Sequence, residues 1–589
     1  MPTESDALRR EVMENVLNLP AGPGRVADFY LPREFLGRVA DRILTAAFEE
    51  QFRKVVADGP TSQPTKAGAT SRPTSRSAGE SGVRVIQTRM SAEREALWRS
   101  WREDYPASRG FRVPLSLPGT TAVSTPQDQT KIAFPFRPTV PGFRVCSESG
   151  ETEIEGLHLQ LSRGDDWLAR GDGGAMDVAG QLAAALPNAR IVASIEQKHL
   201  ANFLNEAADW KSRRRGETWA LVSPMPVAQW AQDNCKFGWV ESDKTDKRVR
   251  VALVPRYPSR GEAGAVFIPG EAVVLQGLAE SGVARVVQSP LLFQAGNLIC
   301  VWDAAKRQRV LLIGEAEIYR NVALGLTQAQ VEEAFRIEFG VDKCVVLPAA
   351  SFHIDYEVSV GRVGERIVAL VNDEEAAALE VIMCGIDALI RVGDLTHDDA
   401  DSIRKAMAGD VSLFEPLSNV LVNETRDTGT FALSFANKFS REPADSGVGN
   451  LQCFLRALDL LTAHHLAEDA LFSDNAMLAS LKALHRRTID RAEIAQTLKS
   501  LGWQVVAIPS MGDSKRALNY LNGIHDKTRF FMPAYGGTFE KVDQAAQAAV
   551  RKAFGPSVEI VPIRCAESQR REGAVRCSAA IMYGPPSVP

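Results

Sequence analysis

Three short segments, far apart in the chain, carry residues whose types could do chemistry together. Cys577 lies near the end of the sequence, after a small, turn-permissive pair and before an apolar run. His353 and Asp355 are two positions apart in the middle of the chain, and Asp233 lies further upstream. A cysteine can supply a thiol nucleophile, a histidine can carry protons, and two carboxylates can hold a cation. Taken singly, each also has an ordinary structural explanation, because most cysteines are small buried hydrophobes and most loop acids are solvated.

The elements between these segments follow a repeating plan. Short runs that are rich in β-branched residues begin with a basic residue or a tryptophan, and they predict strands at 190–193, 250–255, 309–314, 366–371, 503–509 and 529–533. Amphipathic helices are predicted at 327–339 and 538–554, the second with an apolar stripe of Val542, Ala545, Ala549 and Ala553. Further strands, at 344–348 and 558–563, follow these helices. The alternation of strand, helix and strand indicates an α/β fold built from repeated units.

A short polar or glycine-containing segment accompanies each unit. The five segments are residues 230–233, 293–297, 352–355, 518–523 and 573–577. Five units that closed into a ring would bring all of these segments to one central cavity. The three reactive segments are among the five, so the sequence predicts a single site at the centre of the ring.

Composition divides the chain into four parts. Residues 1–56 are predicted to be a helical N-terminal region, and residues 57–82, rich in Ser, Thr, Pro and Gly, a flexible linker. Residues 83–141 are predicted to hold a helix from Arg84 to Tyr105 followed by an extended wrapping segment. Residues 142–589 are predicted to form the catalytic domain, with a mostly helical insertion at about 372–500.

The insertion contains two adjacent histidines, His464 and His465. Adjacent side chains on a helix point about 100° apart, so the two do not form a ligand pair by themselves. They are predicted to face the surface or a partner.

The overall balance is that of an ordinary soluble protein, with 45% hydrophobic residues, 24% charged residues and a net charge of -5. Acids and bases are well mixed, and no apolar run is long enough to cross a bilayer, so neither nucleic-acid nor membrane binding is predicted. Eight scattered cysteines without a CxxC pair argue against a zinc site or a disulfide framework. The first residues show no signal-peptide pattern, so the predicted location is the cytoplasm, and the sequence is compatible with export through a dedicated secretion machine. The oligomeric state is not indicated.

The order of the segments resembles a known enzyme superfamily. Residues 230–239, Trp-Ala-Gln-Asp-Asn-Cys-Lys-Phe-Gly-Trp, are similar to the Trp-x-Gln-Asp-x-x-x-Phe-Gly-Tyr segment of protein-arginine deiminases. Residues 293–298 resemble the Phe-Gly-Asn-Leu of that family, and residues 352–355 resemble the His-x-Asp that it shares with arginine and agmatine deiminases. Residues 531–537 and 573–577 resemble the last repeat of the same superfamily, the guanidino-group modifying enzymes. The resemblance covers roughly Gly142 to the end of the chain. It implies the pentein fold, a five-bladed ββαβ propeller, here with a helical insertion and a separate helical N-terminal region.

The resemblance also implies a reaction and four catalytic residues. Asp233 and Asp355 would hold a planar guanidinium from two sides, which fixes its carbon against the thiolate of Cys577. His353 would protonate the leaving ammonia and later activate the water that releases a ureido product such as citrulline from a covalent thiouronium. The residues expected to bind the substrate are Trp230, Gln232, Asn297 and Arg576.

Two departures leave the substrate open. Gln294 stands where free-arginine and agmatine deiminases have Glu, an acid that protein-arginine deiminases also lack. Arg576 precedes the cysteine as in arginine deiminases, whereas protein-arginine deiminases have His there. The favoured substrate is arginine in a peptide or protein, and the alternative is a small guanidine such as arginine or agmatine. An amidinotransferase and a non-catalytic arginine-binding scaffold are further alternatives, and the retention of all four catalytic residues argues against the scaffold.

No cofactor or metal is predicted. The resemblance to the calcium-dependent animal deiminases suggests calcium, but their acidic ligands after the matching aspartate are replaced here by Asn234-Cys235-Lys236. A lysine ammonium has only donors and repels a cation. The site is therefore expected to form without calcium, and the acidic pairs Asp165-Asp166 and Asp398-Asp399 are expected to be solvated.

Overall fold

The structure is a computed structural model that describes residues 81–88, 132–161, 173–241, 248–255, 270–373, 490–510, 518–570 and 573–586, together with 376, 377, 380 and 397. Within these ranges, residues 225, 226, 228, 229, 323 and 352 are not described. The predicted N-terminal helices at 1–56, the linker up to residue 80, and the insertion helices with His464 and His465 lie outside the described residues. So do the acids Asp165, Asp166, Asp398 and Asp399.

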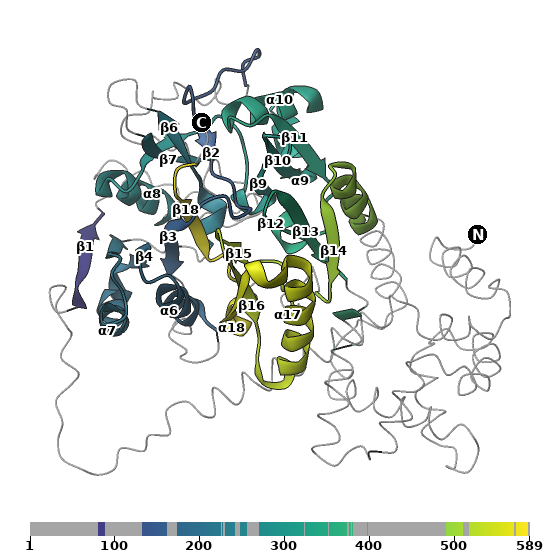
Figure 1. Ribbon diagram of the computed structural model, residues 1–589. Coiled ribbons are helices and arrows are strands. Elements are labelled where there is room, and N and C mark those ends of the chain that lie inside the picture. Colours follow the sequence, from purple (N-terminus) through teal and green to yellow (C-terminus); the bar gives the residue numbers. More distant parts are fainter. Residues whose placement is uncertain are drawn as a thin grey trace, which may run out of the picture.

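The described strands form five separate sheets (Figure 1). The first has the order β1 (Val83–Gln87), β5 (Thr218–Ser223), β4 (Arg190–Glu196), β3 (Ile154–Leu161) and β18 (Ala579–Tyr583). The second has β2 (Arg144–Val145), β6 (Lys236–Glu241), β7 (Arg248–Val254) and β8 (Arg285–Gln288). The third has β9 (Leu298–Asp303), β10 (Gln308–Gly314) and β11 (Lys343–Leu347). The fourth has β12 (Val358–Val363), β13 (Arg366–Asn372) and β14 (Gln504–Ile508), and the fifth has β15 (Ile524–His525), β16 (Arg529–Ala534) and β17 (Glu559–Arg564).

All five sheets share one three-strand plan. An antiparallel pair is followed by a strand that runs parallel to the second member, as in β9, β10 and β11. Helices precede that third strand: α8 (Gly270–Ser281) in the second sheet, α9 (Glu315–Val322) and α10 (Gln328–Glu338) in the third, and α17 (Glu540–Phe554) in the fifth. In the first sheet the antiparallel partner of β3 is β18, the last described strand of the chain. The two ends of the domain therefore build one unit together, and α6 (Ala175–Ala185) links β3 to the parallel β4.

Apolar clusters join the sheets to one another. One lies between the first and second sheets, one between the second and third, one between the third and fourth, and the largest joins the fourth, fifth and first. A strand between two clusters must send alternate side chains to each of them, and β10 does so. Leu311 and Ile313 belong to the cluster between the second and third sheets, while Val310 and Leu312 belong to the cluster between the third and fourth. Strands buried on both faces read as continuous apolar runs. This explains why these strands could be recognised in the sequence.

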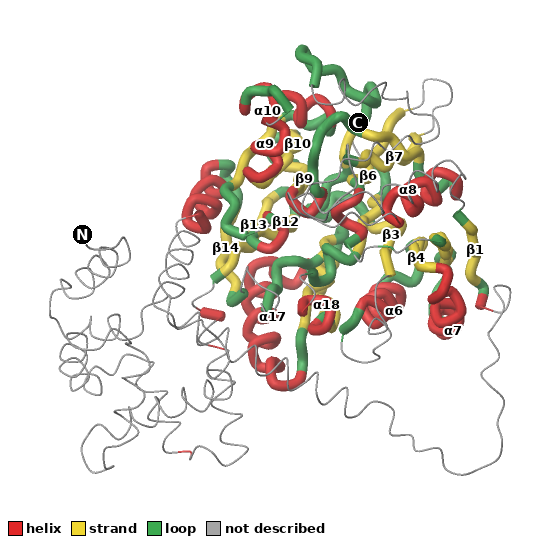
Figure 2. Tube along the Cα trace, turned by 180° about the vertical axis from the view of Figure 1, so that it is seen from behind, coloured by secondary structure: helices red, strands yellow, loops and turns green. Residues whose placement is uncertain are grey.

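Most of the predicted elements are present with small shifts in their bounds. The strands predicted at 190–193, 250–255, 309–314, 366–371, 503–509 and 529–533 are β4, β7, β10, β13, β14 and β16. Helix α10 begins where Thr327 forms a capping box with Gln330. Helices α6, α7 (Leu200–Lys211), α8, α10 and α17 lie on the outside of the strands when the molecule is viewed from the front and from behind (Figures 1 and 2).

Two predictions were wrong in detail. The helix predicted from Arg84 is instead strand β1 over residues 83–87, paired in parallel with β5, and the rest of that predicted helix lies outside the described residues. The run Val83, Val85, Ile86 is β-branched, and β5 offers it an unpaired edge, so strand pairing prevails over helical spacing. In α17 the buried stripe is Val542, Ala546 and Val550, while Ala545 and Ala549 are only half-buried.

The end of the predicted insertion belongs to the fourth unit. Residues 490–500 are helical, and Ile494 and Leu498 are buried in the cluster between the third and fourth sheets. They therefore form the helix that precedes β14, the parallel strand of that unit.

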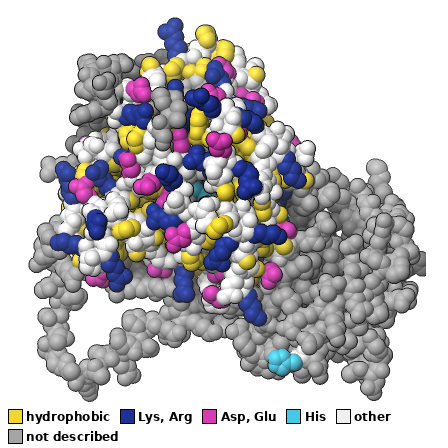
Figure 3. Space-filling model, in the orientation of Figure 1, with side chains coloured by type: hydrophobic (Ala, Val, Ile, Leu, Met, Phe, Trp, Pro, Cys, Tyr) yellow, Lys and Arg dark blue, Asp and Glu magenta, His cyan; other side chains and the backbone are white. Residues whose placement is uncertain are grey.

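None of the described helices is long and apolar enough to span a membrane. On the face shown in Figure 3, basic and acidic side chains are interspersed, as the mixed charge of the sequence predicts.

Candidate active site

Each sheet is entered through a short turn, and these turns carry the candidate residues. One-turn 3₁₀ segments at Ala231–Asn234, Ala295–Asn297 and Ile354–Tyr356 lead directly into β6, β9 and β12. Residues 518–523 lead into β15, and turn residues 575–578 lead into β18. The five segments singled out in the sequence therefore occupy equivalent places in five equivalent units.

Contacts join the five turns in order. Ile354 N donates to Asn297 Oδ1 at 2.9 Å, and Asn519 Nδ2 donates to Tyr356 O at 2.8 Å. Arg576 N donates to Asn522 O at 2.9 Å, and Gln232 N donates to Cys577 O at 3.3 Å. The first and second turns meet at Gly296, where a Cβ would lie 2.9 Å from Asp233 Oδ1. The five segments meet as predicted. The four predicted catalytic residues, Cys577, His353, Asp355 and Asp233, therefore share one site.

Cys577 is held by its neighbours on several sides. Its Sγ accepts from Asn522 Nδ2 at 3.1 Å and lies 3.7 Å from Asp355 Oδ2, and its backbone N donates to Asn522 Oδ1 at 3.1 Å. Trp230 and Tyr356 pack with Cys577 in a small apolar cluster. A Cβ on Gly573 would lie 2.0 Å from the Trp230 ring, so only glycine allows this indole to cover the turn that carries the thiol.

His353 lies between a glutamine and a carboxylate. Its Nε2 is 2.7 Å from Gln294 Oε1, and its Nδ1 is 3.7 Å from Asp233 Oδ1. A Cβ on Gly296 would lie 2.5 Å from Nδ1, so glycine is needed for the ring and the carboxylate to approach each other here. Among the four catalytic candidates Asp233 is the most exposed, with 13% of its side chain accessible against 4% for His353.

Asp355 is fully buried beside an internal cation. Its Oδ2 accepts from Arg576 Nη1 at 2.5 Å, while its Oδ1 is buried with no hydrogen-bond partner among the described residues. Arg576 also donates to Glu148 Oε2 from Nε at 3.0 Å and from Nη2 at 2.7 Å. Lys236 Nζ pairs with the other Glu148 oxygen at 2.5 Å. The carboxylates of Asp355 and Glu148 and the cations of Arg576 and Lys236 thus form one buried network with equal numbers of positive and negative groups.

Three predicted substrate-binding residues have partners inside the protein. Arg576 is engaged by Glu148 and Asp355, as described above. Asn297 Oδ1 accepts from Ile354 N, and its Nδ2 donates to Glu317 Oε1 at 2.9 Å. The Gln232 amide, in the orientation that satisfies its bonds, donates to Ala579 O at 2.9 Å and accepts from Lys236 Nζ at 2.7 Å. These contacts position the turns, whereas Trp230 packs beside the thiol of Cys577, and its expected contact with the substrate stays a prediction.

The electrostatics around Cys577 favour a protonated thiol. Burial raises the pKa of Cys577 well above its ordinary value, the carboxylates of Asp355 and Asp233 raise it further, and the hydrogen bond from Asn522 and the charge of Arg576 oppose the rise. Burial also raises the pKa of Asp355, against the nearby charges of Arg576 and His353. A cation bound between the two carboxylates would offset both effects, because an opposite charge favours the ionised form.

Sequence reasoning missed several residues of the site. Asn522 could have been found, because it belongs to one of the five recognised segments and is the polar side chain nearest the next strand. Glu148 and Tyr356 carried no signal, since neither lies in a motif with a recognisable spacing. Burial lowers the pKa of Lys236 to about 8 while Glu148 opposes the change, so this lysine is an internal ion-pair partner. Within the described ranges, no group of three or more His, Cys, Asp or Glu side chains could hold a metal ion.

No protein-family model matches the chain, and no curated protein matches it. Solved structures that are similar to it include an agmatine deiminase of C. jejuni, with 12% identity and a TM-score of 0.41 over 76% of this chain and 98% of that one. An agmatine deiminase of Enterococcus faecalis shows 14% identity and a TM-score of 0.40 over 77% and 99% of the two chains. A dimethylarginine dimethylaminohydrolase shows 10% identity and a TM-score of 0.26 over 73% and 100%. Similarity at this level carries no inference about activity.

Proposed function

We propose that the chain hydrolyses a guanidinium group, releasing ammonia and leaving a ureido product. The observation that carries the proposal is a carboxylate beside the thiol, that of Asp355, of which one oxygen has no hydrogen-bond partner among the described residues. Asp355 Oδ1 is buried without a partner among the described residues, and the other oxygen of the same carboxylate lies 3.7 Å from Cys577 Sγ. A buried acceptor that lacks a donor is costly, so a cationic donor is expected there when the site is filled. A guanidinium is such a donor, and it pairs with carboxylates through two parallel N–H groups.

In the first half of the reaction the thiol becomes covalently bound. The substrate guanidinium donates to Asp355 Oδ1 on one side and to Asp233 on the other, and its charge lowers the pKa of Cys577, so that the thiol loses its proton to solvent. The thiolate attacks the central carbon and forms a C–S bond. His353, protonated at the Nδ1 that faces Asp233, gives its proton to one nitrogen of the tetrahedral adduct. The C–N bond breaks, ammonia leaves, and a thiouronium remains on Cys577.

In the second half a water molecule replaces the sulfur. Neutral His353 removes a proton from the water at Nδ1, and the hydroxide forms a C–O bond with the thiouronium carbon. The new adduct collapses, the C–S bond breaks, and the remaining hydroxyl proton is released to solvent, so that the ureido product leaves with Cys577 again a thiolate. Trp230, which packs against Cys577, would contact the stem of the substrate.

We propose further that the five sheets are the blades of a five-bladed propeller. The common strand plan, the pairing of β18 with β3 and the apolar clusters that join neighbouring sheets support this arrangement. The five entry turns, with their chain of contacts, would then surround the axis. Residues before 142 contribute strand β1 to the first blade.

The substrate class is tested with a panel of free arginine, agmatine, methylarginine and arginine-containing peptides, scored for ureido product and ammonia. The sequence favours peptidyl arginine, and a small guanidine is the alternative that the panel distinguishes. We expect turnover by the unaltered chain and none by Cys577→Ala with an unchanged circular dichroism spectrum. Product formation by well-folded Cys577→Ala would refute the mechanism. Amidine transfer to an added amine without ammonia release would identify an amidinotransferase, and binding without any product would identify a scaffold.

A further inference from the structure

A second buried carboxylate, on helix α9, is connected to the site through two polar side chains. Glu317 has a fully buried side chain and pairs with Arg320, whose Nη1 lies 2.8 Å and 3.1 Å from the two Glu317 oxygens. Arg320 Nη2 donates to Gln294 Oε1 at 3.1 Å, and the same Oε1 is 2.7 Å from His353 Nε2. Glu317 Oε1 also accepts from Asn297, which holds the turn of His353 and Asp355. The path from helix to imidazole is therefore continuous.

Arginine fixes which atom of Gln294 faces the histidine. A guanidinium has five N–H donors and no acceptor, so the atom it contacts in the Gln294 amide must be the oxygen. That oxygen can only accept, so His353 Nε2 must carry a hydrogen to bond with it. The neutral form of His353 that satisfies these bonds is the Nε2–H tautomer, and the proton that comes and goes is the one on Nδ1. This is the nitrogen that faces Asp233, at 3.7 Å.

We propose that Arg320, anchored by Glu317, is a positioning residue that sets the tautomer of His353 through Gln294. This inference rests on the proposed function, because it assigns the proton transfers of that reaction to Nδ1. Without the arginine, the Gln294 amide could rotate and present its NH₂ group to Nε2. The stable neutral tautomer would then be Nδ1–H, and the nitrogen that faces the substrate could not act as a base. A histidine held in the wrong tautomer costs a serine protease about 10⁴ in kcat, which sets the upper limit of the effect.

A neutral amide at position 294 has a second consequence. A carboxylate 2.7 Å from Nε2 would stabilise the imidazolium and raise the pKa of His353. The amide supplies the same acceptor without the charge, and Arg320 supplies the fixed orientation that a symmetric carboxylate would not need. Gln294 and Arg320 together therefore give Nε2 a fixed acceptor without a negative charge that would keep the histidine protonated.

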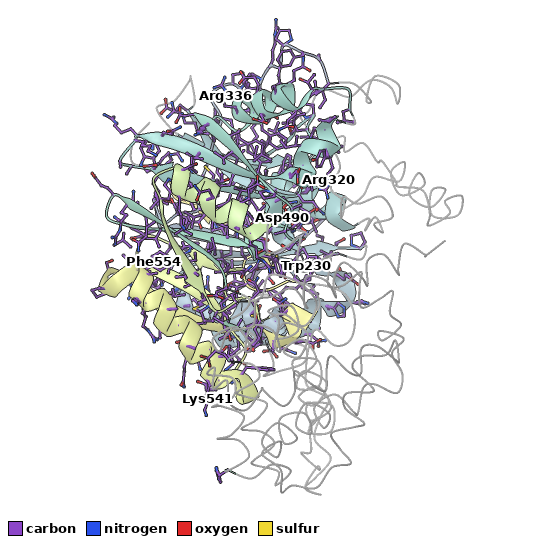
Figure 4. All side chains as sticks on the ribbon, turned by 90° about the vertical axis from the view of Figure 1, so that its right-hand side faces the viewer. Trp230, Arg320, Arg336, Asp490, Lys541 and Phe554 are labelled. Atoms are coloured by element: carbon purple, nitrogen blue, oxygen red, sulfur yellow. The ribbon has the colours of Figure 1, made fainter. Side chains whose placement is uncertain are left out.

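The test compares Arg320→Met, Arg320→Lys and Gln294→Glu in the full-length chain. Arg336→Met is the matched control, because Arg336 makes the same i,i+3 pair with Glu333 on α10 but is 42% exposed. Figure 4 shows Arg336 at one end of the molecule, with Arg320 and Trp230 between it and Lys541. Arg320→Met should lower kcat about 10- to 100-fold with KM changed less than about twofold, as expected when only a proton-transfer group is misplaced. Arg320→Lys restores a donor-only cation and should recover most of that loss, and Arg336→Met should have no effect.

The tautomer itself is read from nitrogen-15 shifts of labelled histidine, with the His353 signal assigned by its absence in His353→Gln. We expect a single Nε2–H form at high pH in the unaltered chain and in Arg320→Lys, and a mixed or reversed tautomer in Arg320→Met. Gln294→Glu should raise the pKa of His353, seen in the same spectra and as a shift of the pH profile of kcat by about one unit or more. An unchanged tautomer in Arg320→Met, or an unchanged pKa in Gln294→Glu, overturns the inference. Because the spectra need no turnover, absence of any guanidine hydrolysis would refute the proposed function separately.

Discussion

Removing the carboxylate of Asp355 should make the cysteine more reactive while it abolishes turnover. Burial and the charges of Asp355 and Asp233 raise the pKa of Cys577. Asp355→Asn removes the nearer of these charges and leaves Arg576 facing the thiol. Both changes favour the thiolate. The same substitution removes the oxygen that is expected to bind the substrate guanidinium, so hydrolysis should fail.

The size of the effect follows from the 3.7 Å separation of Cys577 Sγ and Asp355 Oδ2. At an effective dielectric constant of about 20, two unit charges at this distance interact by about 4 kcal/mol, which corresponds to about a thousandfold in the fraction of thiolate. The nucleophilicity of a thiolate falls as its pKa falls, with a Brønsted slope of about 0.4–0.5, so roughly half of the exponent is lost. A neutral alkylating reagent should therefore react with Cys577 about 30-fold faster in Asp355→Asn than in the unaltered chain.

The assay is alkylation by iodoacetamide between pH 6 and 8, followed by peptide mass spectrometry at Cys577. Glu333→Gln, a surface substitution on α10, is the control and should leave the rate unchanged. Labelling of the other buried cysteines shows whether a variant has opened. Unchanged or slower alkylation of Cys577 in a folded Asp355→Asn protein would show that this carboxylate does not raise the thiol pKa.

Three further outcomes are expected. Gly296→Ala places a Cβ 2.5 Å from His353 Nδ1 and should lower kcat/KM about 100-fold, because a displacement of a catalytic group by about 1 Å has an effect of this size. Gly180→Ala is the control and should leave kcat/KM unchanged, because its Cβ would lie 3.4 Å from the nearest neighbour. Equal activities of the two variants would contradict the close packing at Gly296. His158 and His525 are buried, which lowers the pKa of each to about 3. The unfolded chain therefore binds more protons than the folded chain between about pH 6.5 and 3. As the pH is lowered through that window, the free energy of unfolding, measured in urea, should fall by about 1.4 kcal/mol per pH unit for each histidine. A free energy of unfolding that does not change with pH would show that both histidines are charged in the folded protein. Activity should survive an excess of chelator, because the buried Lys236 ammonium, which pairs with Glu148 under the site, would repel a cation there. Calcium-reversible inactivation by the chelator would refute this.

The elements that could be predicted from the sequence are those whose apolar residues recur with the period of a strand or a helix. Strands β10 and β13 and residues 251–254 of β7 are largely apolar on both faces, and α10 has a capping box and an amphipathic stripe. Each of these elements can therefore be recognised from its own residues. Strand β1 does not, because its pairing with β5 depends on a partner more than a hundred positions away. Likewise β18 is recognisable as an apolar run, but only the structure shows that it completes the first sheet.

The residues of the site also fall into those that the sequence could predict and those whose role only the structure shows. Cys577, His353, Asp355 and Asp233 could be proposed from residue types and order, and the structure brings their side chains together. Whether a polar residue binds substrate or braces the protein depends on its neighbours. Arg576 illustrates this, since its guanidinium is taken up by Glu148 and Asp355, and nothing in its sequence context indicated a carboxylate partner more than four hundred positions away.

A covalent intermediate on one cysteine is the central claim, and mass spectrometry of the intact protein tests it most directly. His353→Gln keeps the thiol and both carboxylates but lacks both the acid that assists ammonia release and the base that activates water, so the adduct should form slowly and then persist. Incubated with a guanidine that the unaltered chain turns over and quenched in acid, this variant should accumulate an adduct with the mass of the substrate less ammonia, located on Cys577. The double variant His353→Gln with Cys577→Ala should show none. An adduct on another residue, or steady product release by His353→Gln without any adduct, would contradict the account.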